Sequence, residues 1–262
     1  MKFDFQKYQG TGNDFIIIDN RDLFFPKHNT RLIADLCHRK FGIGADGLML
    51  LENHPTCDFK MVYFNSDGRE STMCGNGGRC LTHFAKACGI EGETFVFEAI
   101  DGVHSSQILA SGLVRLKMND VHQFVQKENG IFLDTGSPHH VVIVNDLETM
   151  DVKRNGAEIR YGLYREQGAN INFVQQLSDT LFGVRTYERG VEDETLSCGT
   201  GVTAVALAMH YFGKTVSDNV EIKTPGGILH VEFEHANPGY QNIWLIGPAV
   251  KVFEGIWEAK EI

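Results

Sequence analysis

Residues 74–89 read CGNGGRCLTHFAKACG, and residues 198–213 read CGTGVTAVALAMHYFG. Both stretches begin with a cysteine and a Gly-polar-Gly triplet, continue with a run of helical character, and end at a glycine. Glycine is the common residue just beyond a helix. The sequence therefore predicts two helices that each begin at a cysteine, and it raises the question of why one chain carries two of them.

The similarity between the two halves extends beyond these helices. FVFEAIDGV begins 21 residues after Cys74, and the similar VEIKTPGGI begins 22 residues after Cys198. A cysteine-helix-strand-turn unit thus occurs twice, which predicts two structurally similar halves. We expect a break near residues 119–130, with an N-terminal half over residues 1–120 and a C-terminal half over 121–249. A last strand over about 250–262 is expected to return to the N-terminal half.

Apolar and β-branched runs surround the two helices and indicate strands. A hairpin is expected around GTGND, and a further helix over residues 30–42. The other strand candidates are GLMLLE, KMVYFN, TFVFEAIDG, LVRLKMND, HHVVIVND, INFVQQ, LFGVRTYERG, VEIKTPGGILHVEFE and AVKVFEGIW. Strands and helices mixed in this way predict an α+β fold.

Composition excludes several classes of function. The chain has 262 residues and a formal net charge of -10, so a basic nucleic-acid surface is not expected. No apolar run is long enough for a membrane helix, and the N-terminus lacks a signal-peptide pattern. We therefore expect a cytoplasmic protein without a membrane partner. The six cysteines show neither a CxxC motif nor a zinc spacing, so free thiols and no metal are expected.

A cysteine at a helix start lies among backbone N–H groups that favour a thiolate or a bound carboxylate. Inverting a carbon centre needs a base on one face and an acid on the other, and Cys74 and Cys198 could supply both. The pair could also serve as a redox dithiol, or belong to a non-catalytic binding module. The other four cysteines are expected to be structural.

At these residues the chain resembles the diaminopimelate epimerase family. The matching pieces are GTGNDFIIID, FGIGADG, FNSDG, MCGNGGRC, GSPHHV, ANINFV, YERG and SCGTG, in family order over nearly the whole chain. Proline racemase-type enzymes share the double cysteine motif, so proline or hydroxyproline racemisation is the alternative. The resemblance implies cofactor-independent interconversion of LL- and meso-2,6-diaminoheptanedioate, for lysine and peptidoglycan precursors, by a homodimer.

The resemblance also implies the fold and the site. Each half is expected to be a curved, mostly antiparallel, barrel-like sheet wrapped around a central helix, with the active site in the cleft between the halves. Cys74 and Cys198 would be the two acid/base groups. The implied substrate-binding residues are Asn13, Asn65, Gly75, Asn76, Asn170, Glu188, Arg189, Gly199 and Thr200. His139 and Glu188 match residues that adjust the acidity of the thiols.

Two positions depart from the family pattern. Ser137 stands where many members have Asn, and it can still donate a hydrogen bond over a shorter reach. Gly47 stands where some members have Gln, and it has no side chain to offer. Neighbouring His140 competes with His139 for the same role, and the Ser-Pro-His register favours His139.

Overall fold

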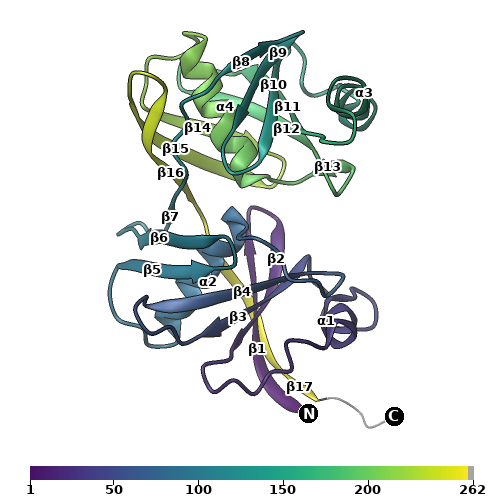
Figure 1. Ribbon diagram of the computed structural model, residues 1–262, viewed down its shortest axis with the longest axis vertical. Coiled ribbons are helices and arrows are strands. Elements are labelled where there is room, and N and C mark those ends of the chain that lie inside the picture. The colour runs from purple at the N-terminus through teal and green to yellow at the C-terminus, as the bar shows by residue number, and fades with distance from the viewer. Residues whose placement is uncertain (259–262) are drawn as a thin grey trace. The chain divides into compact units, whose positions relative to one another are not determined.

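The computed structural model describes residues 1–258 and divides the chain into two compact units. The N-terminal unit comprises Met1–Leu116 and the chain from Pro248 onward, and the C-terminal unit comprises Lys117–Gly247 (Figure 1). Residues 259–262, the end of the expected last strand, lie outside the described residues.

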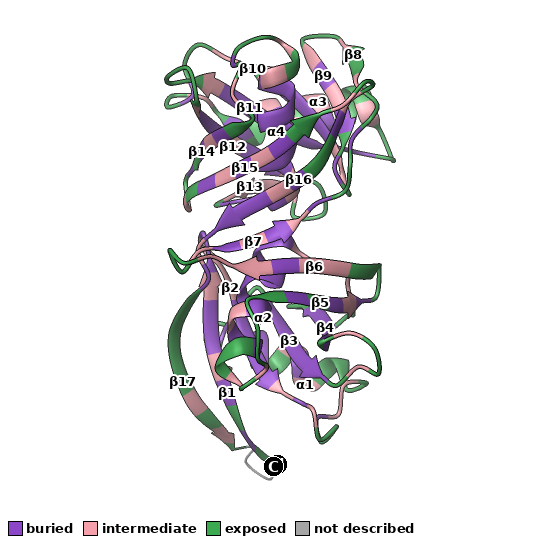
Figure 2. Cartoon of the chain, turned by 90° about the vertical axis from the view of Figure 1, so that its left-hand side faces the viewer, coloured by how far each residue is buried: buried purple, intermediate pink, exposed green. Residues whose placement is uncertain are grey.

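The N-terminal unit is one curved sheet with two helices. Its strands are β1 Lys2–Gly10, β2 Asn13–Asp19, β3 Gly47–Glu52, β4 Phe59–Asn65, β5 Thr94–Ala99, β6 Gly102–Ile108, β7 Val114–Lys117 and β17 Val250–Glu258. They pair in the order β17-β1-β2-β3-β4-β5-β6-β7, with β2–β3 and β4–β5 parallel and the other pairs antiparallel. The helices are α1 Thr30–Cys37 and α2 Gly75–Ala87. Strand β17 forms one edge, and its residues are exposed or half-buried (Figure 2).

The C-terminal unit has the same organisation. Its strands are β8 Val125–Lys127, β9 Gly130–Asp134, β10 Pro138–Ile143, β11 Asn170–Gln176, β12 Leu181–Glu188, β13 Asp193–Thr195, β14 Asn219–Thr224, β15 Gly227–His235 and β16 Tyr240–Gly247. They pair in the order β8-β9-β10-β11-β12-β14-β15-β16, with β10–β11 and β12–β14 parallel, while β13 pairs with β12. The helices are α3 Val152–Tyr164 and α4 Gly199–Tyr211.

Apart from β13, the two sheets match strand for strand, so the predicted repeat and the α+β fold are confirmed. Strands β1 to β7 correspond to β9, β10, β11, β12, β14, β15 and β16, with the parallel pairs in the same places. Helix α2 packs against β1, β2, β3, β4 and β6 of its own unit. Helix α4 packs against the corresponding strands of its own unit, β9, β10, β11, β12 and β15, and also against β14 and β16. Each sheet thus curves around the helix that follows its cysteine.

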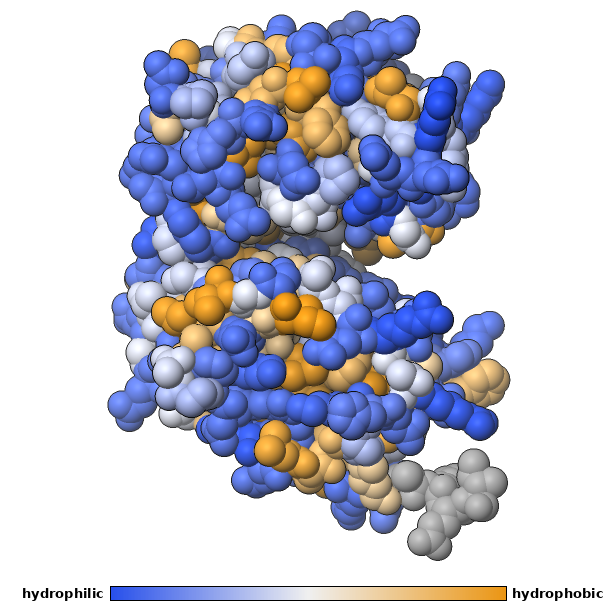
Figure 3. Space-filling model, in the orientation of Figure 1, coloured by the Kyte–Doolittle hydropathy of each residue, from blue (hydrophilic) through white to orange (hydrophobic). Residues whose placement is uncertain are grey.

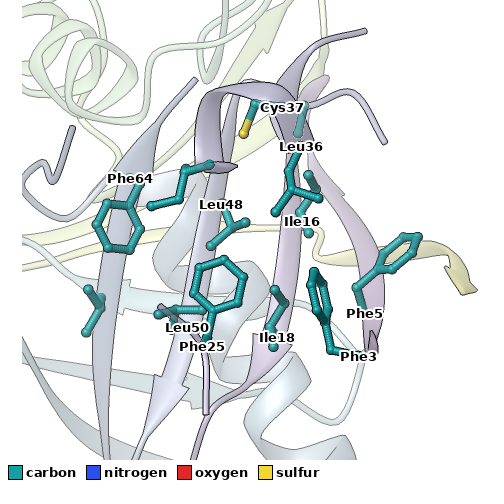
Figure 4. Packing of buried hydrophobic residues seen from close by; sticks show 13 residues of the cluster. Phe3, Phe5, Ile16, Ile18, Phe25, Leu36, Cys37, Leu48, Leu50 and Phe64 are labelled. Carbon is teal, nitrogen blue, oxygen red and sulfur yellow. The ribbon is translucent and has the colours of Figure 1, made fainter. Parts of the chain in front are cut away.

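The sheet of the N-terminal unit is apolar on both faces. Ile16 and Ile18 of β2 and Leu48 and Leu50 of β3 belong to a buried cluster that includes Leu36 of α1 (Figure 4). The alternate residues Phe15, Met49 and Met61 lie against Gly77 of α2. Because helices cover both faces, these strands need continuous apolar runs, and FIII and LMLL supply them.

Helix α1 ends five residues earlier than predicted. The apolar spacing continues as far as Gly42, but the helix stops at Cys37. The backbone N–H groups of Gly44 and Ala45 turn back to the carbonyl oxygens of Leu36 and Cys37. These bonds satisfy carbonyl groups that a helix end leaves without partners. Helix α3 and strands β6, β8, β9, β13 and β16 were not predicted.

The face of the molecule that Figure 3 shows is mostly polar. Figure 3 shows hydrophilic side chains over most of the face in view, with apolar side chains in smaller groups. Within residues 1–258, none of the helices is long and apolar enough to span a bilayer. In the same part of the chain, no cluster of three or more His, Cys, Asp or Glu side chains is arranged to hold a metal ion.

Candidate active site

Both cysteines of the repeated motif occupy the same structural position. Cys74 is the N-cap residue of α2 and Cys198 is the N-cap residue of α4, and both have extended backbone angles. Neither thiol caps its helix, so the first-turn N–H groups are not bonded by the N-cap side chain. Two equivalent helix starts therefore each combine a thiol with backbone groups that attract an anion.

The polar partner of Cys74 comes from the tip of the first hairpin. Thr11 and Gly12 both have positive φ, which fits a tight two-residue turn. This turn places Asn13 at the start of β2, where Asn13 Oδ1 lies 3.4 Å from Cys74 Sγ and accepts from it. Asn13 Nδ2 donates to Asp46 Oδ2 at 2.7 Å, which fixes the orientation of the amide. We use the word half-site for the polar groups that surround one of the two cysteines, Cys74 or Cys198. The predicted hairpin thus carries a residue of the half-site around Cys74.

A buried arginine holds the next residue of this half-site. Asn76 Nδ2 donates to Asn13 Oδ1 at 3.4 Å, and Arg79 Nη2 donates to Asn76 Oδ1 at 3.0 Å. Arg79 has no exposed surface, and its Nη1 also donates to the carbonyl oxygen of Gly75. Burial lowers the pKa of Arg79. The Asn76 side-chain amide is therefore hydrogen-bonded through both its nitrogen and its oxygen, and these bonds fix its orientation.

Asn65 lies in the same row of the sheet as the start of β2. Phe15 pairs with Gly47 in β3, and Gly47 pairs with Asn65 at the end of β4. A side chain on Gly47 would meet the Tyr63 ring at 2.5 Å and the Phe64 carbonyl oxygen at 2.6 Å. The local packing therefore requires glycine at position 47, where the chain departs from the family pattern.

The second half-site is built on β10, β11 and the start of α4. His139 Nε2 lies 2.9 Å from Thr200 Oγ1, and Thr200 Oγ1 lies 3.5 Å from Cys198 Sγ. Asn170 Nδ2 approaches His139 Nε2 at 3.4 Å. These contacts bring together four of the residues that the sequence singled out, because β10 and β11 are parallel neighbours and His139 pairs with Asn170.

The Glu188–Arg189 pair is placed at the end of the adjacent strand. The Arg189 backbone N–H donates to Asn170 Oδ1 at 2.8 Å, and Arg189 Nη1 donates to the carbonyl oxygen of Gln167 at 2.8 Å. Arg189 is exposed, and Glu188 is half-buried. Ile171 pairs with Tyr187, so the next positions along these strands are Asn170 and Glu188. His139, Asn170 and Glu188 therefore form the row that corresponds to Phe15, Gly47 and Asn65.

The two adjacent histidines have different surroundings. His139 faces α4, whereas His140 Nδ1 lies 2.7 Å from the Tyr164 hydroxyl of α3. Successive side chains of a strand point to opposite faces, which explains the difference. Burial lowers the pKa of His139 to about 3, and the charge of Arg189 adds to this shift. His139 is thus neutral at pH 7 and can act on its neighbours only through hydrogen bonds.

Three residues of these half-sites were not identified from the sequence. Asp46 orients Asn13, Arg79 orients Asn76, and Asn172 donates to His139 Nδ1 at 3.1 Å. Asp46 and Arg79 stand inside quoted motifs, FGIGADG and MCGNGGRC, but their charges alone did not distinguish them from surface residues. Asn172 stands in the quoted motif ANINFV between Ile171 and Phe173, and this polar position between apolar residues was the available signal.

A pocket of about 450 Å³ in the N-terminal unit lies away from Cys74. Phe84 and Cys88 line it together with Asp4, Asp19 and Glu254. Cys88 is the C-cap residue of α2, so this pocket is at the opposite end of the helix from the half-site. Burial raises the pKa of the Cys88 thiol to about 11, which keeps it protonated at pH 7.

Comparison with known proteins identifies a family. The family model described as diaminopimelate epimerase matches residues 5–123 and 131–252. A protein named diaminopimelate epimerase from Flavobacterium psychrophilum is 58% identical over 249 residues, covering 95% of this chain and 97% of that protein. One of the same name from Chlorobaculum tepidum is 43% identical over 256 residues, covering 94% and 98%.

Solved structures of lower identity share the fold. A phenazine biosynthesis protein of the PhzF family from Bacillus anthracis has a TM-score of 0.76 at 15% identity, covering 99% of this chain and 100% of that one. A probable proline racemase from Agrobacterium radiobacter has a TM-score of 0.68 at 14% identity, covering 98% and 92%. At such identities these similarities show the fold alone.

Proposed function

The chain belongs to the diaminopimelate epimerase family and is an isomerase, and we propose that it inverts one α-carbon of 2,6-diaminoheptanedioate with Cys74 and Cys198 as the two acid/base groups. The observation that carries this proposal is the equivalence of the two cysteines. Each is the N-cap residue of the central helix of its unit, and each has a polar partner held by further hydrogen bonds.

The proposed reaction is a 1,1-proton transfer. One thiolate removes the Cα proton from one face of the carbon, and the other thiol delivers a proton to the opposite face. The carbanion-like transition state needs electrostatic stabilisation, because the Cα–H of an amino acid is a weak acid. The first-turn N–H groups of α2 and α4, at Gly75, Asn76, Gly199 and Thr200, would supply it by binding the adjacent carboxylate.

The distal end of the substrate would be held by the remaining polar residues. Arg189 can bind a carboxylate with two parallel hydrogen bonds, whereas Asn13, Asn65, Asn170 and Glu188 can accept from an ammonium group. Proline has no distal ammonium and carboxylate, so this set of residues favours diaminopimelate over proline. Neutral His139 would act on the Cys198 thiol through Thr200, and Glu188 would contribute on the same side.

Single-cysteine variants test this proposal. Purified protein should convert LL-diaminopimelate to the meso isomer, and Cys74→Ala and Cys198→Ala should each abolish conversion while the circular dichroism spectrum stays unchanged. Cys57→Ala, which changes a half-buried cysteine outside both half-sites, is the matched control and should retain activity. Full activity in either active-site variant would refute the two-thiol mechanism.

The remaining expectations extend this proposal to the cell. We propose that the protein works in the cytoplasm as a homodimer, without a cofactor, and that its product feeds lysine and peptidoglycan precursor synthesis. Light scattering of the purified protein would test the homodimer, since a monomeric mass at the concentrations used for activity would contradict it.

A further inference from the structure

Asn172 connects the strands of the C-terminal unit to the half-site at Cys198. It lies in β11 with no exposed surface, two residues after Asn170. Thr186 Oγ1 of β12 donates to Asn172 Oδ1 at 3.0 Å. Asn172 Nδ2 lies 3.1 Å from His139 Nδ1 and 3.2 Å from the His140 carbonyl oxygen. The amide is therefore bonded at both ends inside the unit.

These partners determine which way the amide points. A backbone carbonyl oxygen can only accept, so the atom beside the His140 carbonyl must be the amide nitrogen. The Asn170 carbonyl oxygen, 3.4 Å from the same atom, requires the same orientation. One hydrogen of Asn172 Nδ2 is directed to these carbonyls and the other to the imidazole, so His139 Nδ1 accepts a hydrogen bond.

The direction of this bond fixes the proton on the imidazole. A neutral imidazole has one N–H and one lone pair, and His139 is neutral because burial lowers its pKa to about 3. If Nδ1 accepts from Asn172, the ring proton is on Nε2 and points to Thr200 Oγ1 at 2.9 Å. The amide of Asn170 would favour the other tautomer, but its contact with Nε2 is longer, at 3.4 Å.

We propose that Asn172 is a positioning residue that holds His139 as the Nε2–H tautomer, so that the Thr200 hydroxyl accepts from His139 and directs its own proton to Cys198 Sγ. The chain of donors then runs from Thr186 through Asn172, His139 and Thr200 to the sulfur. A donor aimed at the sulfur stabilises its thiolate, the form that removes a proton. This inference rests on the proposed function for the role of Cys198, but not for the tautomer itself.

The first turn of α4 is shaped to admit this arrangement. A Cβ on Gly201 would lie 2.5 Å from Asn172 Oδ1 and 3.3 Å from His139 Cε1. The second glycine of the Cys-Gly-Thr-Gly motif therefore allows the helix to approach both side chains. It gives that glycine a use besides exposing backbone N–H groups to an anion.

Nitrogen NMR of protein labelled with ¹⁵N-histidine tests the tautomer directly, without substrate. Long-range ¹⁵N–¹H correlation distinguishes a protonated from an unprotonated ring nitrogen, and His139→Gln assigns the signals. In the wild type at pH 7 we expect a protonated Nε2 and an unprotonated Nδ1. In Asn172→Asp at pH 9, the carboxylate only accepts, so Nδ1 should become protonated. His140 is the internal control and should keep its tautomer.

A second variant keeps the test independent of folding. Asn172→Leu removes the donor without introducing a charge, and the fraction of the Nε2–H tautomer should fall. A wild-type His139 with its proton on Nδ1 would overturn the proposal. So would a pure Nε2–H tautomer in every Asn172 variant that folds.

Kinetics separate positioning from a general structural role. In Asn172→Asp we expect kcat to fall by about 10- to 100-fold with KM changed by less than about threefold, since the acid/base step alone is impaired. A fall in kcat accompanied by an equally large rise in KM, with an unchanged His139 tautomer, would overturn the proposal. If the wild type shows the expected tautomer but does not epimerise diaminopimelate, the proposed function fails and the role of Asn172 in the tautomer stands.

Discussion

At the residue scale, the half-sites consist of reactive groups whose neighbours leave them few orientations. Asn13 is held by Asp46 and Asn76 by Arg79, while His139 is held by Asn172. Amide and imidazole groups can present either a donor or an acceptor, so these outer partners decide which of the two each group presents. In the proposed mechanism these outer partners therefore act by orienting the groups beside the thiols, although they carry no reacting atom.

Arg189 gives the sharpest test of substrate selectivity. In Arg189→Ala we expect diaminopimelate turnover to lose about 10- to 150-fold in kcat/KM, as one charge-assisted contact of about 1.5–3 kcal/mol is removed. Arg154→Ala, which changes an exposed arginine of α3, is the control. Steady-state kinetics of both variants measure the effect. Racemisation of proline by the wild type, with diaminopimelate inert, would contradict the assignment of Arg189.

The buried histidines make stability depend on pH. Burial lowers the pKa of His140 to about 4, below the value of about 6.5 for an exposed imidazole. The unfolded chain therefore binds more protons between these pH values. The contribution of His140 to the free energy of unfolding is fully present above about pH 6.5 and is lost as the pH falls toward 4.

His140→Gln removes one titrating group and can still accept from Tyr164. Between about pH 7.5 and about pH 5, its free energy of unfolding should fall by about 2 kcal/mol less than that of the wild type. Urea unfolding at the two pH values measures this difference. An identical pH dependence in both proteins would show that His140 is not buried as a neutral group.

At the scale of elements, the two central helices are equivalent in position but differ in how closely they are packed. Gly77 of α2 and Gly201 of α4 each stand three residues after a cysteine. A Cβ on Gly77 would meet Met49 Sδ at 3.1 Å, the end of a flexible side chain, whereas one on Gly201 would meet Asn172 Oδ1 at 2.5 Å.

Alanine at these two glycines should therefore have different effects. Both substitutions gain about 1 kcal/mol of helix propensity. We expect Gly77→Ala to keep the free energy of unfolding within about 1 kcal/mol of the wild type, and Gly201→Ala to lower it by about 1–3 kcal/mol through overpacking. Chemical denaturation compares the pair. A Gly201→Ala protein as stable as Gly77→Ala would mean that the first turn of α4 has more room than the structure gives it.

The elements that could be predicted from sequence were those whose pattern of apolar residues has a single physical explanation. The apolar runs of β2, β3 and β4 predicted strands because both faces of the sheet are covered. Helix α3 was not predicted, since it contains two glycines and only one buried strip, of Val152, Gly156 and Arg160. Its start depends on Asp151, whose carboxylate accepts from the Arg154 N–H, a local signal without a strong apolar pattern behind it.

At the scale of the whole molecule, a repeated motif predicted a repeated topology. Both units have the same strand order and the same two parallel pairs, with a cysteine at the start of the central helix. The family pattern indicated the residues that we propose to touch the substrate. It did not find Asp46, Arg79 or Asn172, because their role depends on which atoms the folded chain places beside them.

The two-thiol mechanism predicts where solvent hydrogen enters the substrate, and this is the most direct test of it. LL-diaminopimelate is incubated with the protein in D₂O, and the product and the recovered substrate are examined by NMR at early times. We predict deuterium at the inverted α-carbon of the meso product and little in the recovered substrate, because one cysteine removes the proton and the other delivers a solvent-derived deuteron. Retention of the original proton in the product, or no deuterium in either isomer, would contradict the mechanism.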